Sequence, residues 1–219
     1  MTTIDSDGTR PRPSVLGSLG YLVLNLPVGI AGFTALVVLL SVGVGSAVVW
    51  VGLPVLALAV VGVRVAARVE RARVYAMLDT YIASPYRPLP ERGRWKARVS
   101  DVATWRDATY FLLLFPLGIA EFVVMVTAWT TSLGLLALPF YYRFLPDASF
   151  RFGDWDHPWL VVDSFVEALP FAMVGLVLFA LTVPLTRVMG GVHARFARVL
   201  LGPSPAVVRS FDERVEVAV

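Results

Sequence analysis

The sequence predicts an all-α integral membrane protein in which four transmembrane helices form two hairpins. Three observations support this fold class. Hydrophobic residues make up 57% of the chain and charged residues only 16%, the mean hydropathy is +0.72, and no Asp, Glu, Lys or Arg occurs between Pro13 and Val63. Soluble domains are about one quarter charged. Because about 20 helical residues cross a bilayer, this uncharged stretch predicts two crossings joined by a tight turn.

The remaining elements follow in chain order. We expect crossings at about 14–40, 45–63, 108–129 and 168–186, with the first turn near Ser41–Gly43 and a helical extension of the second crossing as far as Leu78. The predicted segments are a polar tail (1–13), a membrane domain (14–203) and a second tail (204–219). Within the membrane domain they are a first hairpin (about 14–66), a connector (67–106) and a second hairpin (about 107–187) with an outer loop (140–165).

The distribution of cationic residues predicts the orientation in the membrane. Cytoplasmic segments carry an excess of Lys and Arg. Of the 19 such residues, only Arg143 and Arg151 fall in the outer loop, and the other 17 fall in the N-terminal tail, in the segment from Arg64 to Arg106 and in the segment from Arg187 onward. We therefore expect a multi-pass protein of the cell membrane with both termini in the cytoplasm.

The second half of the chain resembles the first. The segment YLVLNLPVGIAGF, from Tyr21 to Phe33, aligns with YFLLLFPLGIAEF, from Tyr110 to Phe122, at a constant offset of 89 residues. Since both halves would begin in the cytoplasm, they would be parallel pseudo-repeats about an axis along the membrane normal.

Each copy carries a proline followed two residues later by a glycine. A proline inside a helix removes a backbone donor and kinks the helix, and a glycine lets a second helix approach closely. The candidate helix hinges are therefore Pro27, Gly29, Pro116 and Gly118. The alternative is that membrane helices simply tolerate both residue types.

Glu121 is the one carboxylate deep inside a predicted crossing. An ionised side chain there costs about 2.5–3.5 kcal/mol on insertion scales and is a functional candidate by default. Asn25 is its candidate hydrogen-bond partner, and Gly32 is its counterpart in the first half. A proton relay, a ligand contact and a structural hydrogen bond all remain open.

Two surfaces outside the crossings are further candidates. The outer loop is aromatic and acidic, and its candidate residues for an extracytoplasmic ligand or partner are Trp155, Asp156, His157 and Trp159. Interfacial anchoring by its aromatic rings is the alternative. The connector is basic, with an amphipathic helix expected over residues 95–107 that would lie on anionic lipid. Its candidate contacts to lipid or to a partner are Arg68, Arg71, Arg73, Arg94, Lys96 and Arg98, with Glu70 on the same exposed surface.

The residue types present argue against catalysis. The chain has no cysteine, which excludes disulfides, zinc–thiolate sites and thiol chemistry. It also lacks a phosphate-binding Gly-x-x-x-x-Gly-Lys loop, a nucleophile elbow and a His-Glu-x-x-His pair. His193 has no carboxylate near it in sequence and is expected at a solvated helix end. We expect no enzyme activity, no cofactor, no metal and no nucleic-acid partner.

Several short motifs resemble the sensor domain family of actinobacteria, which occurs at the N-terminus of two-component histidine kinases and also as stand-alone proteins. The motifs are LPVGIA (26–31), GLP (52–54), ERAR (70–73), WRDATY (105–110), FPLG (115–118), LP (138–139) and LLGP (200–203). Only residues 204–219 follow the last motif, so the resemblance does not bring the family's kinase activity to this chain.

The resemblance implies a stand-alone, non-catalytic sensing or regulatory module that signals to a partner in trans. The partner would be a cytoplasmic or membrane signalling protein, such as a histidine kinase or a transcriptional regulator, and a homodimer is also open. The alternative is an accessory subunit of a membrane transporter, or a small transporter with its site near Glu121.

Overall fold

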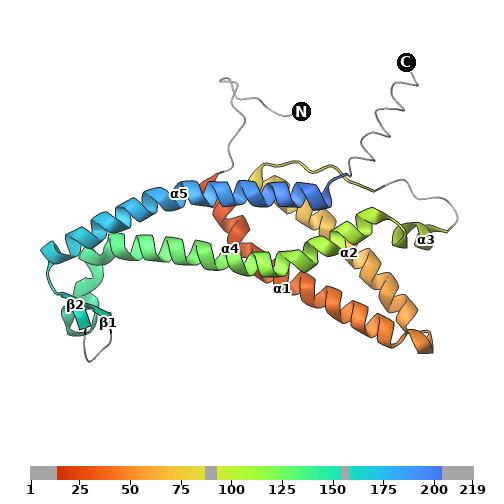
Figure 1. The fold of residues 1–219 in the computed structure, drawn as a ribbon, viewed down its shortest axis with the longest axis horizontal. Coiled ribbons are helices and arrows are strands. Elements are labelled where there is room, and N and C mark those ends of the chain that lie inside the picture. The colour runs from red at the N-terminus through yellow and green to blue at the C-terminus, as the bar shows by residue number, and fades with distance from the viewer. Residues whose placement is uncertain (1–13, 87–92, 154–157, 204–219) are drawn as a thin grey trace, which may run out of the picture. The chain divides into compact units, whose positions relative to one another are not determined.

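The computed structural model describes residues 14–86, 93–153 and 158–203 (Figure 1). In this part of the chain four helices are long and apolar enough to cross a membrane. They are α1 (Val15–Gly45), α2 (Gly52–Leu78), α4 (Val102–Tyr141) and α5 (Phe165–Leu201). The most apolar 18-residue window of each is only 17–28% buried. So much exposed apolar surface fits contact with lipid rather than with water.

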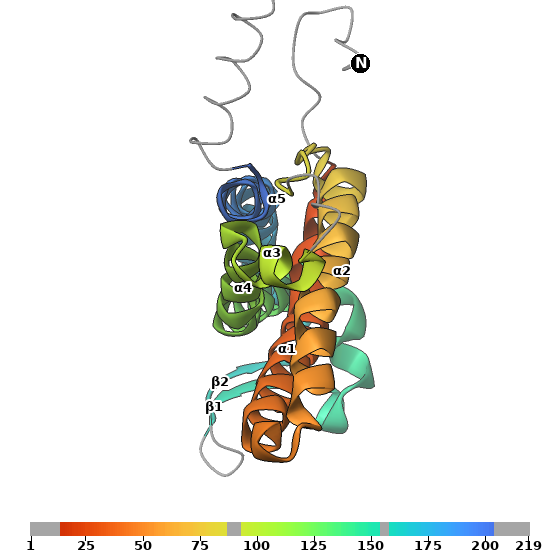
Figure 2. The same cartoon turned by 90° about the vertical axis from the view of Figure 1, so that its right-hand side faces the viewer.

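Helices α1 and α2 form an antiparallel hairpin and lie side by side (Figure 2). Ser14 caps the start of α1, where its Oγ accepts a hydrogen bond from the Gly17 amide. The short 3₁₀ helix η1 (Ala47–Val49) makes the turn, and Trp50 closes it in the left-handed region at φ 64°. The predicted turn near 41–43 is therefore wrong, because α1 continues to Gly45.

Two glycines explain the position of this turn. A β-carbon on Gly52 would lie 2.1 Å from the carbonyl oxygen of Gly43, so the chain can fold back here only if residue 52 has no side chain. The extension of α2 to Leu78 agrees with the sequence prediction, and the helix ends at Asp79 with φ 50°.

A second break separates the connector from α4. The expected helix over 95–107 is interrupted, since the short helix α3 (Arg94–Val99) ends before Ser100 and α4 begins at Val102. Asp101 explains the restart, because its Oδ1 accepts from the Ala103 amide at 3.0 Å as an N-terminal cap.

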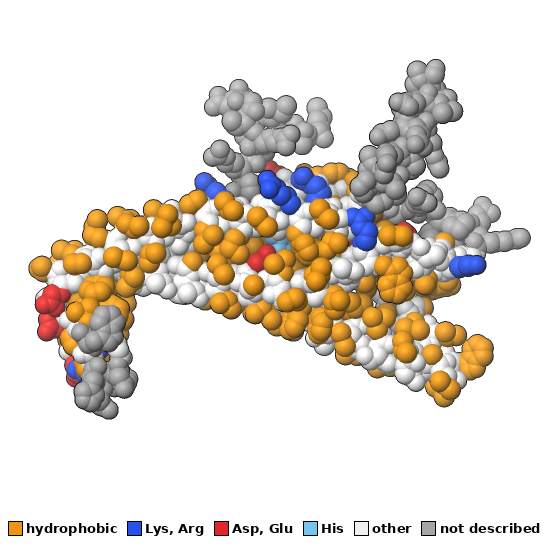
Figure 3. Space-filling view, viewed as in Figure 1, with side chains coloured by type: hydrophobic (Ala, Val, Ile, Leu, Met, Phe, Trp, Pro, Cys, Tyr) orange, Lys and Arg blue, Asp and Glu red, His pale blue; other side chains and the backbone are white. Residues whose placement is uncertain are grey.

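The chain forms two compact units, which are described separately. Unit 1 comprises residues 1–122 and 187–219, and unit 2 comprises residues 123–186. Helices α4 and α5 run side by side and belong to both (Figures 1 and 2). Over the part of unit 1 that holds α3 and the C-terminal end of α5, Lys and Arg side chains gather, while hydrophobic side chains cover much of the remaining face in view (Figure 3).

Unit 2 contains the outer loop, which includes two short strands that the all-α prediction missed. After the 3₁₀ turns η2 (Tyr142–Phe144) and η3 (Pro146–Ala148), β1 (Phe150–Gly153) pairs antiparallel with β2 (Pro158–Val162). Phe150 lies opposite Val162 and Phe152 opposite Leu160. Leu138, Val162 and Ala168 are buried beneath surrounding aromatic side chains. Strands of 4 and 5 residues are too short for alternating apolar and polar side chains to be a strong sequence signal.

Candidate functional site: a buried polar network

Seven polar side chains lie together inside unit 1, where α1, α2, α4 and α5 meet. We call them the polar network. Its members are Tyr21 and Asn25 from α1, Glu70 and Arg73 from α2, Tyr110 and Glu121 from α4, and His193 from α5. All but Arg73 are at most 4% exposed, and the Arg73 side chain is 13% exposed. Buried polar groups are costly unless they bond to one another, so the network fixes how the four helices pack.

Glu70 is the acceptor at one end of the network. Its Oε1 accepts from the Tyr21 hydroxyl at 2.6 Å and from the Tyr110 hydroxyl at 2.9 Å. Arg73 holds both carboxylate oxygens, with Nε at 3.0 Å from Oε2 and Nη2 at 2.9 Å from Oε1. The guanidinium also lies 4.3 Å from the centre of the Tyr21 ring. A bidentate, ring-stacked arginine is the geometry in which this pairing is strongest.

Asn25 connects this end to the other carboxylate. Its Oδ1 accepts from Nη2 of Arg73, and its Nδ2 donates to Oε2 of Glu121 at 2.6 Å. The structure thus brings together Asn25 and Glu121, which the sequence analysis paired on polarity alone.

His193 closes the network between α4 and α5. Its Nδ1 lies 2.6 Å from Oε1 of Glu121, and its Nε2 lies 3.1 Å from the Tyr110 hydroxyl. The ring packs edge-on against Tyr21 and Phe196, with centroids 5.0 and 5.6 Å away. The expected solvated helix end is wrong, since His193 is 1% exposed and its carboxylate comes from another helix.

Six of these side chains form a closed ring of contacts. In order around the ring they are Glu121, Asn25, Arg73, Glu70, Tyr110 and His193. Tyr21 lies beside the ring and donates to Glu70. Each of the four long helices contributes at least one member, so a movement of any one helix within unit 1 must stretch or break a contact of the ring.

The sequence analysis missed Tyr21, Glu70, Tyr110 and His193 as members of a site, and it assigned Arg73 to a lipid or partner contact. It placed Glu70 and Arg71 on an exposed face of α2, which is wrong because they are 2% and 7% exposed. The signal was present in the spacing. From Arg64 onward the buried residues of α2 follow one another at helical intervals on one face, and they are Arg64, Ala67, Glu70, Arg71, Val74 and Leu78. Charges that fall on the apolar stripe of a helix are inside, not in solvent.

Two glycines let α1 and α4 cross closely beside the network. A β-carbon on Gly29 would lie 2.9 Å from the carbonyl oxygen of Leu114, and one on Gly118 would lie 2.7 Å from the carbonyl oxygen of Asn25. Pro27 and Pro116 lie inside α1 and α4, and both helices continue through them. The two glycines serve as close-packing positions, and a hinge role of the four residues stays a prediction.

A second polar cluster holds the connector to the helices of unit 1. The Tyr86 hydroxyl donates to Oδ2 of Asp107 at 2.6 Å and accepts from Nη2 of Arg71 at 3.2 Å. The guanidinium carbons of Arg64 and Arg71 lie 4.5 and 5.1 Å from the centre of its ring. Burial is the largest cause that raises the pKa of Tyr86 to about 12, against the hydrogen bond from Arg71, which lowers it.

The predicted contact surface is smaller in the structure than in the sequence analysis. Arg68 and Lys96 are exposed, and Arg98 is partly buried with its guanidinium 5.3 Å from the Trp95 ring centre. Arg71 and Arg73 do not belong to an exposed surface, because Arg71 bonds to Tyr86 and Arg73 bonds within the polar network. The following predictions lie outside the described residues or side chains: Arg94, Trp155, Asp156, His157 and Trp159.

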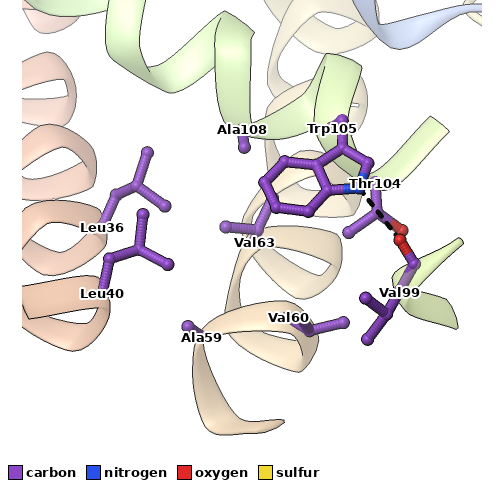
Figure 4. Close-up of a pocket in the computed structure, with 9 residues that line it drawn as sticks. All are labelled: Leu36, Leu40, Ala59, Val60, Val63, Val99, Thr104, Trp105 and Ala108. Atoms are coloured by element: carbon purple, nitrogen blue, oxygen red, sulfur yellow. Dashed lines mark hydrogen bonds between the residues drawn. The ribbon is translucent and has the colours of Figure 1, made fainter. Parts of the chain in front are cut away.

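An apolar pocket opens between α1, α2, α3 and the start of α4 (Figure 4). It is lined by Leu36, Leu40, Ala59, Val60, Val63, Val99, Thr104, Trp105 and Ala108. The Trp105 indole donates to the carbonyl of Val99 at 2.9 Å, which ties α3 to α4 at the pocket. Thr104 already bonds Arg64, so the pocket offers hydrocarbon contact and no free polar group from these lining residues.

Comparison with protein families places this chain. Residues 21–201 match the family model named Sensor, whose description is "Putative sensor". The chain belongs to the Sensor family. The matched range includes every member of the polar network, from Tyr21 to His193. Comparisons with curated proteins and with solved structures gave no match. Among the described residues, no group of three or more His, Cys, Asp or Glu is placed to hold a metal ion.

Proposed function

We propose that this Sensor-family protein is a non-catalytic membrane module that responds to a stimulus by repacking its helices and passes the change to a partner protein. The single observation that supports this most directly is the closed ring of buried polar contacts joining α1, α2, α4 and α5. Signalling needs an element with two discrete arrangements that a stimulus can bias. We assign this role to the buried ring, because a stimulus that changes one of its contacts leaves buried groups unpaired, which is costly unless the helices repack.

The crossing of α1 and α4 supports the proposal that the two halves are parallel pseudo-repeats. At the offset of 89 residues Gly29 corresponds to Gly118 and Asn25 to Leu114, and the two glycine contacts are exchanged accordingly. Tyr21 and Tyr110 also correspond, and their hydroxyls lie 3.3 Å apart. Glu121 breaks this relation, since its counterpart Gly32 lies against the Phe111 ring. Within the aligned segments, the asymmetry of the repeat therefore includes the position where the network meets His193.

The proposed setting is the cell membrane of an actinobacterium, with both termini in the cytoplasm. The partner is a cytoplasmic or membrane signalling protein, a histidine kinase or a transcriptional regulator in the first instance. Its contact would use the exposed cations Arg68 and Lys96 beside Arg98. The family description favours sensing over the transport alternative.

The test measures whether the network controls helix packing. Because the chain has no native cysteine, spin labels can be placed at Val69→Cys in α2 and Val199→Cys in α5, which are 63% and 66% exposed. Pulsed EPR in lipid nanodiscs then reports the distance between the two helices. We expect Glu121→Gln to change the distance distribution and the matched surface variant Glu167→Gln to leave it unchanged. An unchanged distribution in both variants would reject the switching role.

The partner is tested separately in cells. A photo-crosslinking residue at Lys96 should capture a signalling protein, and the same residue at Leu58, an exposed apolar position of α2, should not. Capture of a permease or a transport ATPase at Lys96 would instead support the transport alternative.

A further inference from the structure

We infer that the polar network is a proton-binding site, in which His193 and Glu121 share one exchangeable proton whose loss rearranges the ring. The inference rests on the proposed function and names the stimulus of the same site. It follows from counting donors and acceptors around the ring.

One side of the ring has fixed hydrogen-bond directions. Arg73 can only donate, so Asn25 Oδ1 and Glu70 both accept from it. With its oxygen so engaged, Asn25 presents its NH₂ group to Glu121, whose Oε2 accepts. These directions do not depend on any titrating proton.

The other side of the ring depends on one proton. When the Tyr110 hydroxyl donates to Glu70 at 2.9 Å, its oxygen must accept from Nε2 of His193 at 3.1 Å. The contact of 2.6 Å between Nδ1 of His193 and Oε1 of Glu121 then needs a proton of its own. That proton sits either on Nδ1, as an imidazolium facing a carboxylate, or on the carboxyl oxygen, facing a neutral ring. Both forms hold the same number of protons and satisfy every contact of the ring.

Removal of that proton breaks one contact in either of two ways. If Nε2 keeps its hydrogen, two lone pairs face each other across 2.6 Å between His193 and Glu121, and the donor that still faces Nδ1 is the Asn25 amide at 3.3 Å. If the remaining hydrogen moves to Nδ1, Tyr110 must donate to Nε2 and can no longer donate to Glu70. The deprotonated network is therefore strained at α5 or at the contact between α4 and α2.

The charges give the same result. With the shared proton present, Glu70 balances Arg73 and the pair of Glu121 and His193 is neutral as a whole. Without it the buried site carries one uncompensated negative charge, which is unfavourable in a low-dielectric interior. The titratable groups that contact His193 are Tyr21 from α1, and Tyr110 and Glu121 from α4. From α2, Glu70 bonds to both tyrosines and to Arg73. Among them Arg73 is the one fixed cation.

The first test observes the proton directly. The chain has two histidines, His157 and His193, so the His157→Gln variant leaves one. Solid-state NMR of ¹⁵N-labelled histidine in lipid bilayers distinguishes protonated from bare ring nitrogens. Because the shared proton sits on Nδ1 or on the carboxyl oxygen, the ¹³C signal of the Glu121 carboxyl is followed in the same samples over about pH 5 to 8, the range in which histidine side chains commonly change charge. We expect one of the two groups to lose its proton as the pH rises. Glu121→Gln removes one holder of the proton, so it should alter the states of the His193 ring. A ring and a carboxyl that both keep one state throughout, or ring states that Glu121→Gln leaves unchanged, would overturn the inference.

The second test links the proton to helix packing. The spin-label distance between Val69→Cys and Val199→Cys is measured at both ends of the same pH range. We expect a shift between two distances in the otherwise native chain and in His157→Gln, and no pH-dependent shift in His193→Gln. Distances that change in Glu121→Gln but not with pH would reject the proton as stimulus while the proposed function stands. Distances that change in neither experiment would reject both.

Discussion

Nδ1 of His193 and Oε1 of Glu121 lie 2.6 Å apart, although 72 residues separate them in the chain. This contact joins the C-terminal part of α5 to the middle of α4 within unit 1. It also gives the intramembrane-type carboxylate a second partner besides Asn25. Glu121 is therefore not an isolated charge, and its carboxylate contacts an imidazole as well as the Asn25 amide. Its protonation has to be considered together with that of the His193 imidazole.

The two tyrosines of the network have unequal roles. The Tyr110 hydroxyl contacts both Glu70 and His193, whereas the Tyr21 hydroxyl contacts Glu70 and Tyr110. We expect Tyr110→Phe to lower the free energy of unfolding by about 1–3 kcal/mol, because Nε2 of His193 is left buried and unpaired. Tyr21→Phe should cost less, about 1 kcal/mol, because Glu70 keeps its other donors.

Unfolding in SDS–detergent mixtures, followed by circular dichroism, measures both free energies. Phe retains the ring in each variant, so ring packing serves as the internal control. If the two variants lose the same stability, Tyr110 does not bridge the two ends of the ring.

The crossing of α1 and α4 makes a second prediction. A β-carbon on Gly118 would lie 2.7 Å from a backbone oxygen of Asn25, whereas one on Gly134 of the same helix meets nothing within 4 Å. Gly118→Ala should therefore destabilise the protein by about 1–3 kcal/mol through overpacking. Gly134→Ala should stabilise it by roughly 0.5–1 kcal/mol, since alanine favours helix. The same unfolding assay decides, and equal effects of the two substitutions would contradict close contact at Gly118.

The connector is held through Tyr86, which predicts its local stability. Tyr86→Phe keeps the ring beneath Arg64 and Arg71 but removes the hydroxyl that donates to Asp107. We expect amide hydrogen exchange of residues 79–86 to accelerate about tenfold, which corresponds to a loss of about 1.4 kcal/mol in local opening. Tyr81→Phe is the matched control, because Tyr81 is 71% exposed and its ring packs edge-on against that of Tyr75, a contact that Phe retains. Unchanged exchange in Tyr86→Phe would show that other contacts hold the connector.

The membrane helices could be predicted from sequence because lipid leaves little choice. An uncharged stretch such as Pro13–Val63 must hide its backbone polar groups within helices, and α1 and α2 follow. Asn25 and Glu121 could be paired because each is a polar side chain inside an apolar segment, where few other side chains could form a hydrogen bond with it. The small sheet at Phe150 and Val162 was not predicted because its strands have only 4 and 5 residues, too few for a clear alternation of apolar and polar side chains.

The rest of the network could not be predicted, because the sequence pattern around a charged residue near a helix end does not tell whether its side chain lies in solvent or in a core. Glu70 and His193 are followed or preceded by arginines, which favoured a solvated interpretation. Their burial depends on which helices pack against them, and that is set by contacts between residues as far apart in the chain as 168 positions. The helical spacing of Glu70 with Ala67 and Val74 was the local signal that a core position carried the charge.

The orientation in the membrane is the last prediction, and the absence of native cysteine makes it directly testable. Trp50 lies in the turn between α1 and α2 and is 78% exposed, and Tyr81 lies in the connector and is 71% exposed. If the excess of Lys and Arg sets the topology, these two positions lie on opposite sides of the membrane. A membrane-impermeant maleimide added to intact cells should label Trp50→Cys and leave Tyr81→Cys unlabelled until the cells are opened. The cysteine-free parent chain controls for background labelling. Labelling of Tyr81→Cys in intact cells, with protection of Trp50→Cys, would show that the topology is the inverse of the proposed one. The exposed cations Arg68 and Lys96 would then lie outside the cell and could not contact a cytoplasmic partner.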